Sequence, residues 1–224
     1  MWIMTVDQQD SRRVGDRVGA LLDALGAETS PLAAAAPRGV VLPFERTVGD
    51  EVQAVLADPA LVVALTLHLV RLGGWSIGIG AGSVDEPLPA SSREASGRAF
   101  IHAREAVEAA KSRSRTVPVA VRGDDPSAAA ESEAVLALLG AVVARRTAAG
   151  WAVVDRMTSV PGTEPPRQED AAAALGISQQ AVSERLRTAL WAEELAARPA
   201  AARLLRLAAG PRDDGAAVEG EEPA

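Results

Sequence analysis

The stretch from Gln168 to Ala189 constrains the fold most strongly, because it has the pattern of two short helices joined by a tight turn. Gly176 follows the first helix where the chain must reverse, and a residue without a Cβ enters the left-handed conformation at little cost. Ser178 is placed to cap the second helix by accepting a hydrogen bond from the backbone amide of Ala181. The apolar residues at spacings that pack the two helices together are Ala172, Leu175, Ile177, Val182 and Leu186. This pattern is typical of a helix-turn-helix.

The second helix of this motif presents a polar outer face once Val182 and Leu186 are turned inward. In the major groove of DNA, Gln pairs with adenine, Arg with guanine or phosphate, and Ser with base or phosphate. We therefore expect double-stranded DNA to be bound by Ser178, Gln179, Gln180, Ser183 and Arg187. The alternative is a helical hairpin that only packs a domain or a dimer. Glu184 on the same face favours that alternative, because its carboxylate repels phosphate.

Composition excludes several kinds of site. The chain has 224 residues, enough for one large domain or two small ones, and it contains no Cys. Disulfides, thiolate zinc sites and Cys nucleophiles are therefore excluded, and two His are too few for a His-based metal cluster. Apolar residues make up 48% of the chain but aromatic residues only 3%, so Ala, Val and Leu must build the core.

The net charge of −7 limits how the chain can bind nucleic acid. A protein that binds DNA through a generally basic surface is positively charged, because phosphate neutralisation supplies the non-specific affinity. We therefore expect DNA binding to be local, salt-sensitive and assisted by formation of a homodimer. The start of the chain has no signal-peptide pattern, and the apolar segment 60–72 is too short to span a bilayer. These features predict a cytoplasmic protein with no membrane segment.

Up to residue 123 the chain alternates between strand and helix patterns. Gly49-Asp50 lies between two apolar runs, which is a strong hairpin signal. The expected order is strand 2–6, helix 13–25, two strands flanking Gly49-Asp50, helix 59–72, strand 75–82, helix 92–112 and strand 116–121. This order predicts an α+β fold with a ferredoxin-like domain over residues 1–123, with an antiparallel sheet and helices on one face.

From residue 124 onward only helical patterns are present. Helices are expected over 127–148 and 151–157, in the helix-turn-helix, and over 190–207 with a break near Pro199. We therefore predict an all-α helix-turn-helix domain over residues 124–209. Residues 161–166 are expected to form a loop, as is the Ala- and Pro-rich segment 30–38. The polar, acidic segment 210–224 is expected to be a disordered tail.

Taken together, these motifs resemble the SatD family of bacterial proteins over about residues 3 to 205. The first strand ends in Asp7-Gln8-Gln9-Asp10-Ser11-Arg12, which matches the family's opening motif. The other matching motifs are a hairpin with Gly49, Asp50, Glu51 and Gln53, a strand with Gly78-Ile79-Gly80, a helix with Gly97, Ala103 and Arg104, and the C-terminal helix-turn-helix. The resemblance implies a DNA-binding transcription regulator whose N-terminal domain dimerises, senses a ligand, or does both.

The N-terminal half is also similar to the catalytic core of nucleotidyl and diguanylate cyclases. In those enzymes a strand-end Asp and a hairpin acid hold two divalent metals against a nucleoside triphosphate. Asp7 and Asp50 occupy the corresponding positions, so the similarity implies a site for Mg²⁺ or Mn²⁺ and a nucleotide ligand. Arg12, Arg98 or Arg104 would then contact the phosphate oxygens.

The sequence departs from the cyclases in ways that favour a regulator over an enzyme. It has no Gly-Gly-Asp-Glu-Phe motif, no Lys placed for a triphosphate and no recognisable base-reading pair. Simpler roles for the same residues stay open: Asp50 and Glu51 can serve only as hairpin-turn residues, and Asp7 can form an ion pair with Arg12 or Arg104. The alternative function is a metal-dependent nucleotide-binding or cyclase-like protein whose helical part is an interaction module.

Overall fold

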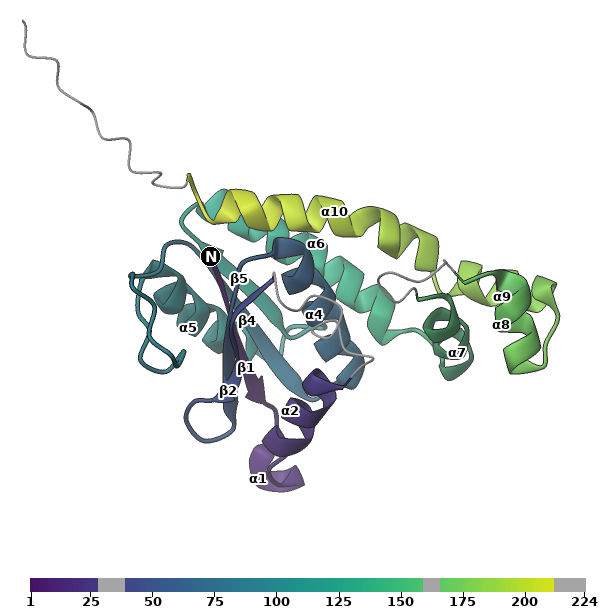
Figure 1. Ribbon diagram of the computed structural model, residues 1–224, viewed down its shortest axis with the longest axis horizontal. Helices are drawn as coiled ribbons and strands as arrows, with labels where there is room; N and C mark the ends of the chain where they lie inside the picture. The colour runs from purple at the N-terminus through teal and green to yellow at the C-terminus, as the bar shows by residue number, and fades with distance from the viewer. Residues whose placement is uncertain (28–38, 159–165, 212–224) are drawn as a thin grey trace, which may run out of the picture.

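The computed structural model describes residues 1–27, 39–158 and 166–211. These residues form a mixed α+β structure built on one five-stranded sheet (Figure 1). The segment 30–38, nearly all of the expected loop 161–166 and nearly all of the expected tail 210–224 lie outside the described residues.

The sheet contains five strands in the order β2-β3-β1-β4-β5. Their bounds are β1 Trp2–Gln8, β2 Val40–Arg46, β3 Glu51–Leu56, β4 Trp75–Ala81 and β5 Val119–Gly123. The pairs β2–β3, β3–β1 and β1–β4 are antiparallel, as predicted, and the hairpin turn contains Gly49 with φ of 64°. The last pair, β4–β5, is parallel. The prediction of a wholly antiparallel sheet is therefore wrong, because a helical crossover returns the chain in the direction of β4.

Helices cover both faces of the sheet, so the prediction of helices on one face is also wrong (Figure 1). Helices α2 (Val18–Gly26) and α4 (Pro59–Leu72) lie on one face, and α5 (Arg98–Ala110) lies on the other. The side chains of β1 divide accordingly: Met4 belongs to the large core on the α4 side, whereas Ile3 packs with Ala99 and Ala103 on the α5 side. The two apolar faces follow from the alternation of side chains along a strand.

The glycines of β4 allow α5 to approach the sheet very closely. A Cβ on Gly80 would lie 2.1 Å from the carbonyl oxygen of Ala99, and a Cβ on Gly78 would lie 2.3 Å from the backbone nitrogen of Val107. Glycines on one face of a strand leave room for another backbone or a ligand. In this protein the space is occupied by the backbone of α5.

Two helices after residue 124 belong to the core of the sheet rather than to a separate domain. Helix α6 (Pro126–Ala144) contacts α4 and β5, and α10 (Trp191–Ala208) contacts α4 and α6. The indole nitrogen of the buried Trp2 donates to the carbonyl of Leu205, at 3.0 Å. The boundary predicted at residue 124 therefore runs through one hydrophobic core. Among the described helices, α6 alone is long and apolar enough to cross a membrane, but its buried face is part of this core.

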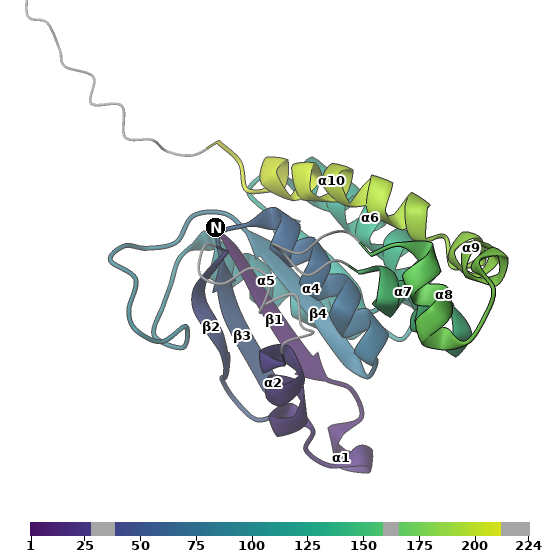
Figure 2. The same ribbon diagram turned by 45° about the vertical axis from the view of Figure 1, so that its right-hand side comes forward.

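Three further helices form a small unit with its own core. They are α7 (Ala148–Met157), α8 (Gln168–Leu175) and α9 (Gln179–Thr188). Val153, Ala172, Val182 and Leu186 are among its buried residues. Figures 1 and 2 show this α7–α9 unit at one end of the molecule, beyond the sheet. It is inserted between α6 and α10, and both of these helices belong to the larger core.

Several predicted helices differ from the observed ones in their limits or continuity. The helix expected over 127–148 ends at Ala144, and α7 begins at Ala148, so Gly150 lies inside a helix and not at the break. The helix expected over 13–25 is divided at Gly15, whose φ is 79°, into α1 (Ser11–Val14) and α2. The helix expected from residue 92 begins only at Arg98, because the preceding segment is bonded to β2. The break expected near Pro199 is absent, and α10 continues through that exposed proline.

The close approach of α5 predicts that Gly80→Ala destabilises the protein strongly. The new methyl group meets backbone atoms of α5 that cannot move independently, and overpacking of this kind costs about 1–3 kcal/mol or more. The matched control is Gly19→Ala in α2, where a Cβ meets nothing within 4 Å and removal of a helical glycine stabilises by about 0.5–1 kcal/mol. Urea unfolding measures both changes. Equal effects of the two substitutions would contradict the packing described for β4.

Candidate functional site

The turn between α8 and α9 has the geometry that the sequence predicts. Gly176 ends α8 in the left-handed conformation, with φ of 62° and ψ of 34°. The amide of Ile177 then donates to the carbonyl of Ala172 at 3.1 Å, which closes the end of the helix. Ser178 caps α9, since its Oγ accepts from the amide of Ala181 at 3.1 Å. The predictions for Gly176 and Ser178 as local turn residues are confirmed.

Helix α9 has one buried side and one polar exposed side. Val182 and Leu186 are buried in the core of the α7–α9 unit. The residues predicted to bind DNA are all exposed: Ser178, Gln179, Gln180, Ser183 and Arg187. We call these five residues the outer face of α9. The face has hydrogen-bonding side chains along the first turns and an arginine near the end of the helix.

An ion pair partly neutralises this outer face. The guanidinium of Arg187 donates to both carboxylate oxygens of Glu184, with Nη2–O distances of 2.6 and 2.8 Å. Both side chains are exposed. The bonds to Glu184 raise the pKa of Arg187, so the guanidinium remains charged. Contact of Arg187 with a nucleic acid would require exchange of Glu184 for a phosphate or a base, which makes Glu184 a competitor for the same guanidinium.

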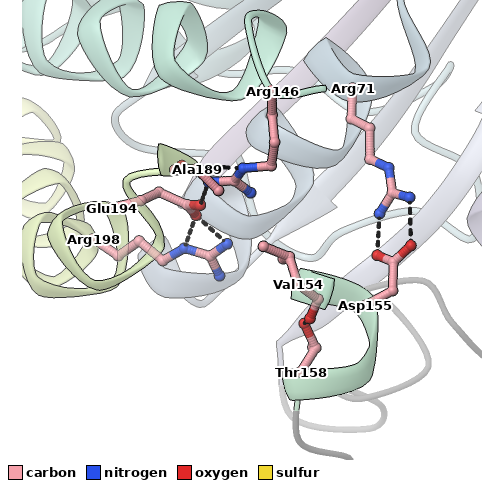
Figure 3. A network of polar contacts seen from close by, with 8 residues as sticks. All are labelled: Arg71, Arg146, Val154, Asp155, Thr158, Ala189, Glu194 and Arg198. Carbon is pink, nitrogen blue, oxygen red and sulfur yellow. Dashed lines mark hydrogen bonds and ion pairs between the residues drawn. The ribbon is translucent and has the colours of Figure 1, made fainter. Parts of the chain in front are cut away.

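A buried network of charged groups attaches the α7–α9 unit to the main core (Figure 3). Arg146 follows α6, and its guanidinium donates to the carbonyl of Ala189 at the end of α9 and to Glu194 of α10, with Nη2–O distances of 2.9 and 2.8 Å. The side chains of Arg146 and Glu194 are each only 1% exposed. Arg198, one turn further along α10, donates through Nε to the other carboxylate oxygen of Glu194 at 2.7 Å.

A second contact between the same parts of the protein surrounds Trp151 of α7. The guanidinium of Arg71, in the last turn of α4, lies 3.8 Å from the centre of the Trp151 ring, and that of Arg146 lies 4.5 Å from it. Arg71 also donates to both carboxylate oxygens of Asp155, at 2.6 and 2.8 Å (Figure 3). These stacked and paired groups fix α7 against α4 and stabilise the position of the whole unit.

The second predicted site lies at the end of β1. The Asp7 carboxylate forms an ion pair with the ammonium of Lys111, at 3.1 Å, rather than with Arg12 or Arg104. Burial raises the pKa of the Asp7 carboxyl; Lys111 opposes this shift, and repulsion from Asp50 and Glu51 adds to it. Asp50 lies in the hairpin turn, close enough to Asp7 for this repulsion. The described residues contain no group of three or more His, Cys, Asp or Glu that is arranged to hold a metal ion.

The three arginines predicted to contact phosphate lie in different places. Arg12 lies on α1 and is exposed. Arg98 pairs through Nε with Asp124 at 2.9 Å, and that carboxylate also accepts from His102 Nε2 at 2.9 Å. Arg104 lines a groove together with Arg93, Glu51 and other polar residues. The structure therefore does not bring Arg12, Arg98 and Arg104 together.

Sequence reasoning missed two features of the described residues. The Arg146–Glu194 pair joins positions 48 residues apart, and neither residue belongs to a recognisable motif. Arg93 was placed inside a helix, although it lies in the segment that precedes α5. The signal that was available for Arg93 is the run of Pro, Ser and Gly between residues 87 and 97, which favours an irregular segment.

Comparison with known proteins identifies no family, because no family model, no curated protein and no solved structure matches this chain. The resemblance to the SatD family stays a prediction.

The buried network predicts that Glu194→Gln destabilises the protein strongly. The variant leaves the buried Arg146 guanidinium without a compensating charge, and loss of one partner of a buried ion pair costs about 3–5 kcal/mol. Glu193→Gln, at the adjacent exposed position, is the matched control and should have little effect. The double substitution Arg146→Met, Glu194→Leu should recover most of the loss in urea unfolding. A Glu194→Gln protein as stable as the control would show that the pair does not fix the unit.

The environment of Asp7 predicts a pH-dependent effect of Asp7→Asn. Because the folded-state pKa is raised above 3.8, this carboxyl contributes stability that is complete below that value and is lost as the pH rises through the folded pKa. The asparagine variant should therefore gain stability relative to wild type between acid and neutral pH. Asp16→Asn is the control, and its effect on stability should have the opposite sign: this variant should lose stability relative to wild type as the pH rises. The reason is that a hydrogen bond from Arg46 lowers the pKa of Asp16. Urea unfolding at several pH values measures both, and parallel pH profiles would contradict this account.

Proposed function

We propose that the protein is a DNA-binding transcription regulator in which α8 and α9 form a helix-turn-helix. The observation that carries the proposal is the capped turn at Gly176 and Ser178, followed by a helix whose polar outer face is free in the described structure. In this motif the second helix enters the major groove, with its first residues against base edges. Gln179 and Gln180 occupy those first positions and have amide groups suited to adenine.

The way in which α9 is held supports the same proposal. A recognition helix must be presented rigidly, because base contacts depend on side chains placed to within a fraction of an ångström. The end of α9 is bonded through Ala189 to the buried Arg146, and α7 beneath it is fixed by Arg71. The α7–α9 unit is therefore attached to the sheet core at two points while the outer face of α9 stays exposed.

The charge of the chain indicates how such a protein would bind. With a net charge of −7, phosphate contacts must come from a few local arginines, and a single unit supplies few of them. We propose that the protein binds as a homodimer on two half-sites, which doubles those contacts. The strand order β2-β3-β1-β4, with antiparallel neighbours, supports a ferredoxin-like N-terminal part that carries dimerisation or ligand sensing.

The proposal predicts opposite effects of two substitutions on DNA affinity. Arg187→Gln removes a phosphate or base contact and should lower the salt dependence of binding by about one unit of log–log slope per protomer. Glu184→Gln releases Arg187 from its ion pair and should raise affinity. Fluorescence anisotropy with a labelled random-sequence duplex, at roughly 50 to 200 mM salt, measures both slopes.

The control for this experiment is Arg113→Gln, an exposed position in the segment between α5 and β5. It changes the net charge as Arg187→Gln does but lies outside the α7–α9 unit. If all three variants bind like the wild-type protein, or if no salt-sensitive binding is present at the lowest salt concentration, the outer face of α9 is not a DNA-binding surface.

A further inference from the structure

A groove on the α5 side of the sheet is lined by charged and polar side chains. Its two arginines form no ion pair within the described structure. It lies between β3 and the segment that leads into α5, and its volume is about 520 Å³. A smaller adjoining cavity of about 140 Å³ extends it to β1. A volume of this size is within the range of small-molecule sites. The residues that line both spaces are Glu51, Gln53, Arg93 and Arg104.

The two arginines supply positive charge that no carboxylate of the described residues neutralises through an ion pair. Arg93 and Arg104 are both exposed, and neither forms an ion pair with any residue of the ranges 1–27, 39–158 and 166–211. They come from separate elements, the irregular segment before α5 and α5 itself, yet they line the same groove. Two guanidiniums at one concave surface favour an oxyanion, because each presents a planar set of donors to phosphate or carboxylate oxygens.

The other lining groups include two carboxylates, Glu51 and Glu94, together with hydroxyl and amide side chains and one aromatic ring. The carboxylate of Glu51 accepts from Thr47 Oγ1 at 2.6 Å and has further acceptor capacity on the groove side. Gln53 adds an amide with both a donor and an acceptor. Phe100 forms an apolar wall of the smaller cavity. Such a lining suits a ligand with an anionic group at one end and hydrogen-bond donors on its body, rather than a bare inorganic ion.

The wall that carries Arg93 is held in place by a hydrogen-bonded carboxylate. Glu45 of β2 accepts from Ser91 Oγ, Ser92 Oγ and the amide of Arg93 through Oε1, at 2.7, 2.8 and 3.2 Å. These bonds lower the pKa of Glu45, and the bond from Ser91 contributes most to this shift. The carboxylate therefore remains an acceptor at neutral pH. The segment before α5 is thereby tied to the edge strand of the sheet, and the groove keeps its shape without a ligand.

We propose that this groove binds a small organic oxyanion, a phosphate ester or a carboxylate, that also carries hydroxyl or amino donors. Arg93 and Arg104 bind the anionic group, and Glu51 and Gln53 accept from or donate to the body of the molecule. The site adjoins the Asp7–Lys111 pair, because Glu51 is the cross-strand neighbour of Asp7, but neither Asp7 nor Lys111 lines it. Two guanidiniums provide its positive charge. The proposal does not rest on DNA binding, since the groove lies on the sheet and not on the α7–α9 unit.

Isothermal titration of the full chain, in buffer freed of divalent metals by a chelating resin and without DNA, tests this proposal. The probes are ribose 5-phosphate for the phosphate class, citrate for the carboxylate class, and ribose as the uncharged control. Arg93→Gln and Arg104→Gln should each weaken binding of the preferred anion about tenfold or more, as loss of a charge-assisted hydrogen bond implies. Arg203→Gln, an exposed position on α10 across the sheet, should leave the affinity within about twofold.

Each outcome of the titration decides the proposal. Binding of ribose 5-phosphate or of citrate that both groove variants lose supports it and assigns the class of anion, and ribose should not bind in either case. Absence of binding by both anions up to roughly 10 mM overturns it, since a built site gives at least millimolar affinity. Binding that the groove variants retain also overturns it. Because no DNA is present, these outcomes are independent of the regulator proposal.

Discussion

The buried ion pair between Arg146 and Glu194 is the interaction on which the arrangement of this protein depends. Removal of two charges from water is costly, and the cost is recovered only when every donor and acceptor has a partner. Here the carboxylate is shared by Arg146 and Arg198, and the Arg146 guanidinium also reaches the carbonyl of Ala189 (Figure 3). A shift of α9 relative to α10 would break these bonds together, so the network selects one orientation of the helices.

This orientation connects the two parts of the molecule. Helix α10 starts at the end of α9, after Leu190 in a left-handed conformation, and ends beside β5, where the carbonyl of Ala208 accepts from the amide of Asp125. Along the way its backbone accepts from Trp2 of the central strand. The exposed face of α9 and the groove beside β3 lie on different surfaces and next to different hydrophobic clusters, and α10 connects the two parts through the main core.

Local features of the fold could be predicted from the sequence, because each depends on a few adjacent residues. The left-handed Gly176, the Ser178 cap and the hairpin at Gly49-Asp50 are set by backbone preferences of single residues. The start of α4 after Asp58 follows for the same reason, since that side chain accepts from the amide of Ala60. The outer face of α9 could be predicted because the apolar residues of this helix recur at helical spacing on its other side.

Features that join distant segments could not be predicted. Nothing near Asp7 indicates that its partner is Lys111, and nothing near Arg146 indicates Glu194. The parallel strand β5 and the packing of α6 and α10 on α4 also depend on tertiary contacts. These contacts join the segments on both sides of residue 124, where the change to purely helical patterns had predicted a domain boundary. Pro199 remains within α10 because the rest of the helix is held by its packing.

Selection of bound sequences from a pool of random duplexes, followed by sequencing, tests directly whether α9 is a recognition helix. The experiment would compare the wild-type protein with the Gln180→Ala, Arg187→Ala double variant, whose changes lie only on the exposed side of α9. The account predicts one enriched motif with two related half-sites about one helical turn apart, and its loss in the double variant. Absence of any enriched motif, or the same motif for both proteins, would contradict the assignment of α9 as a recognition helix.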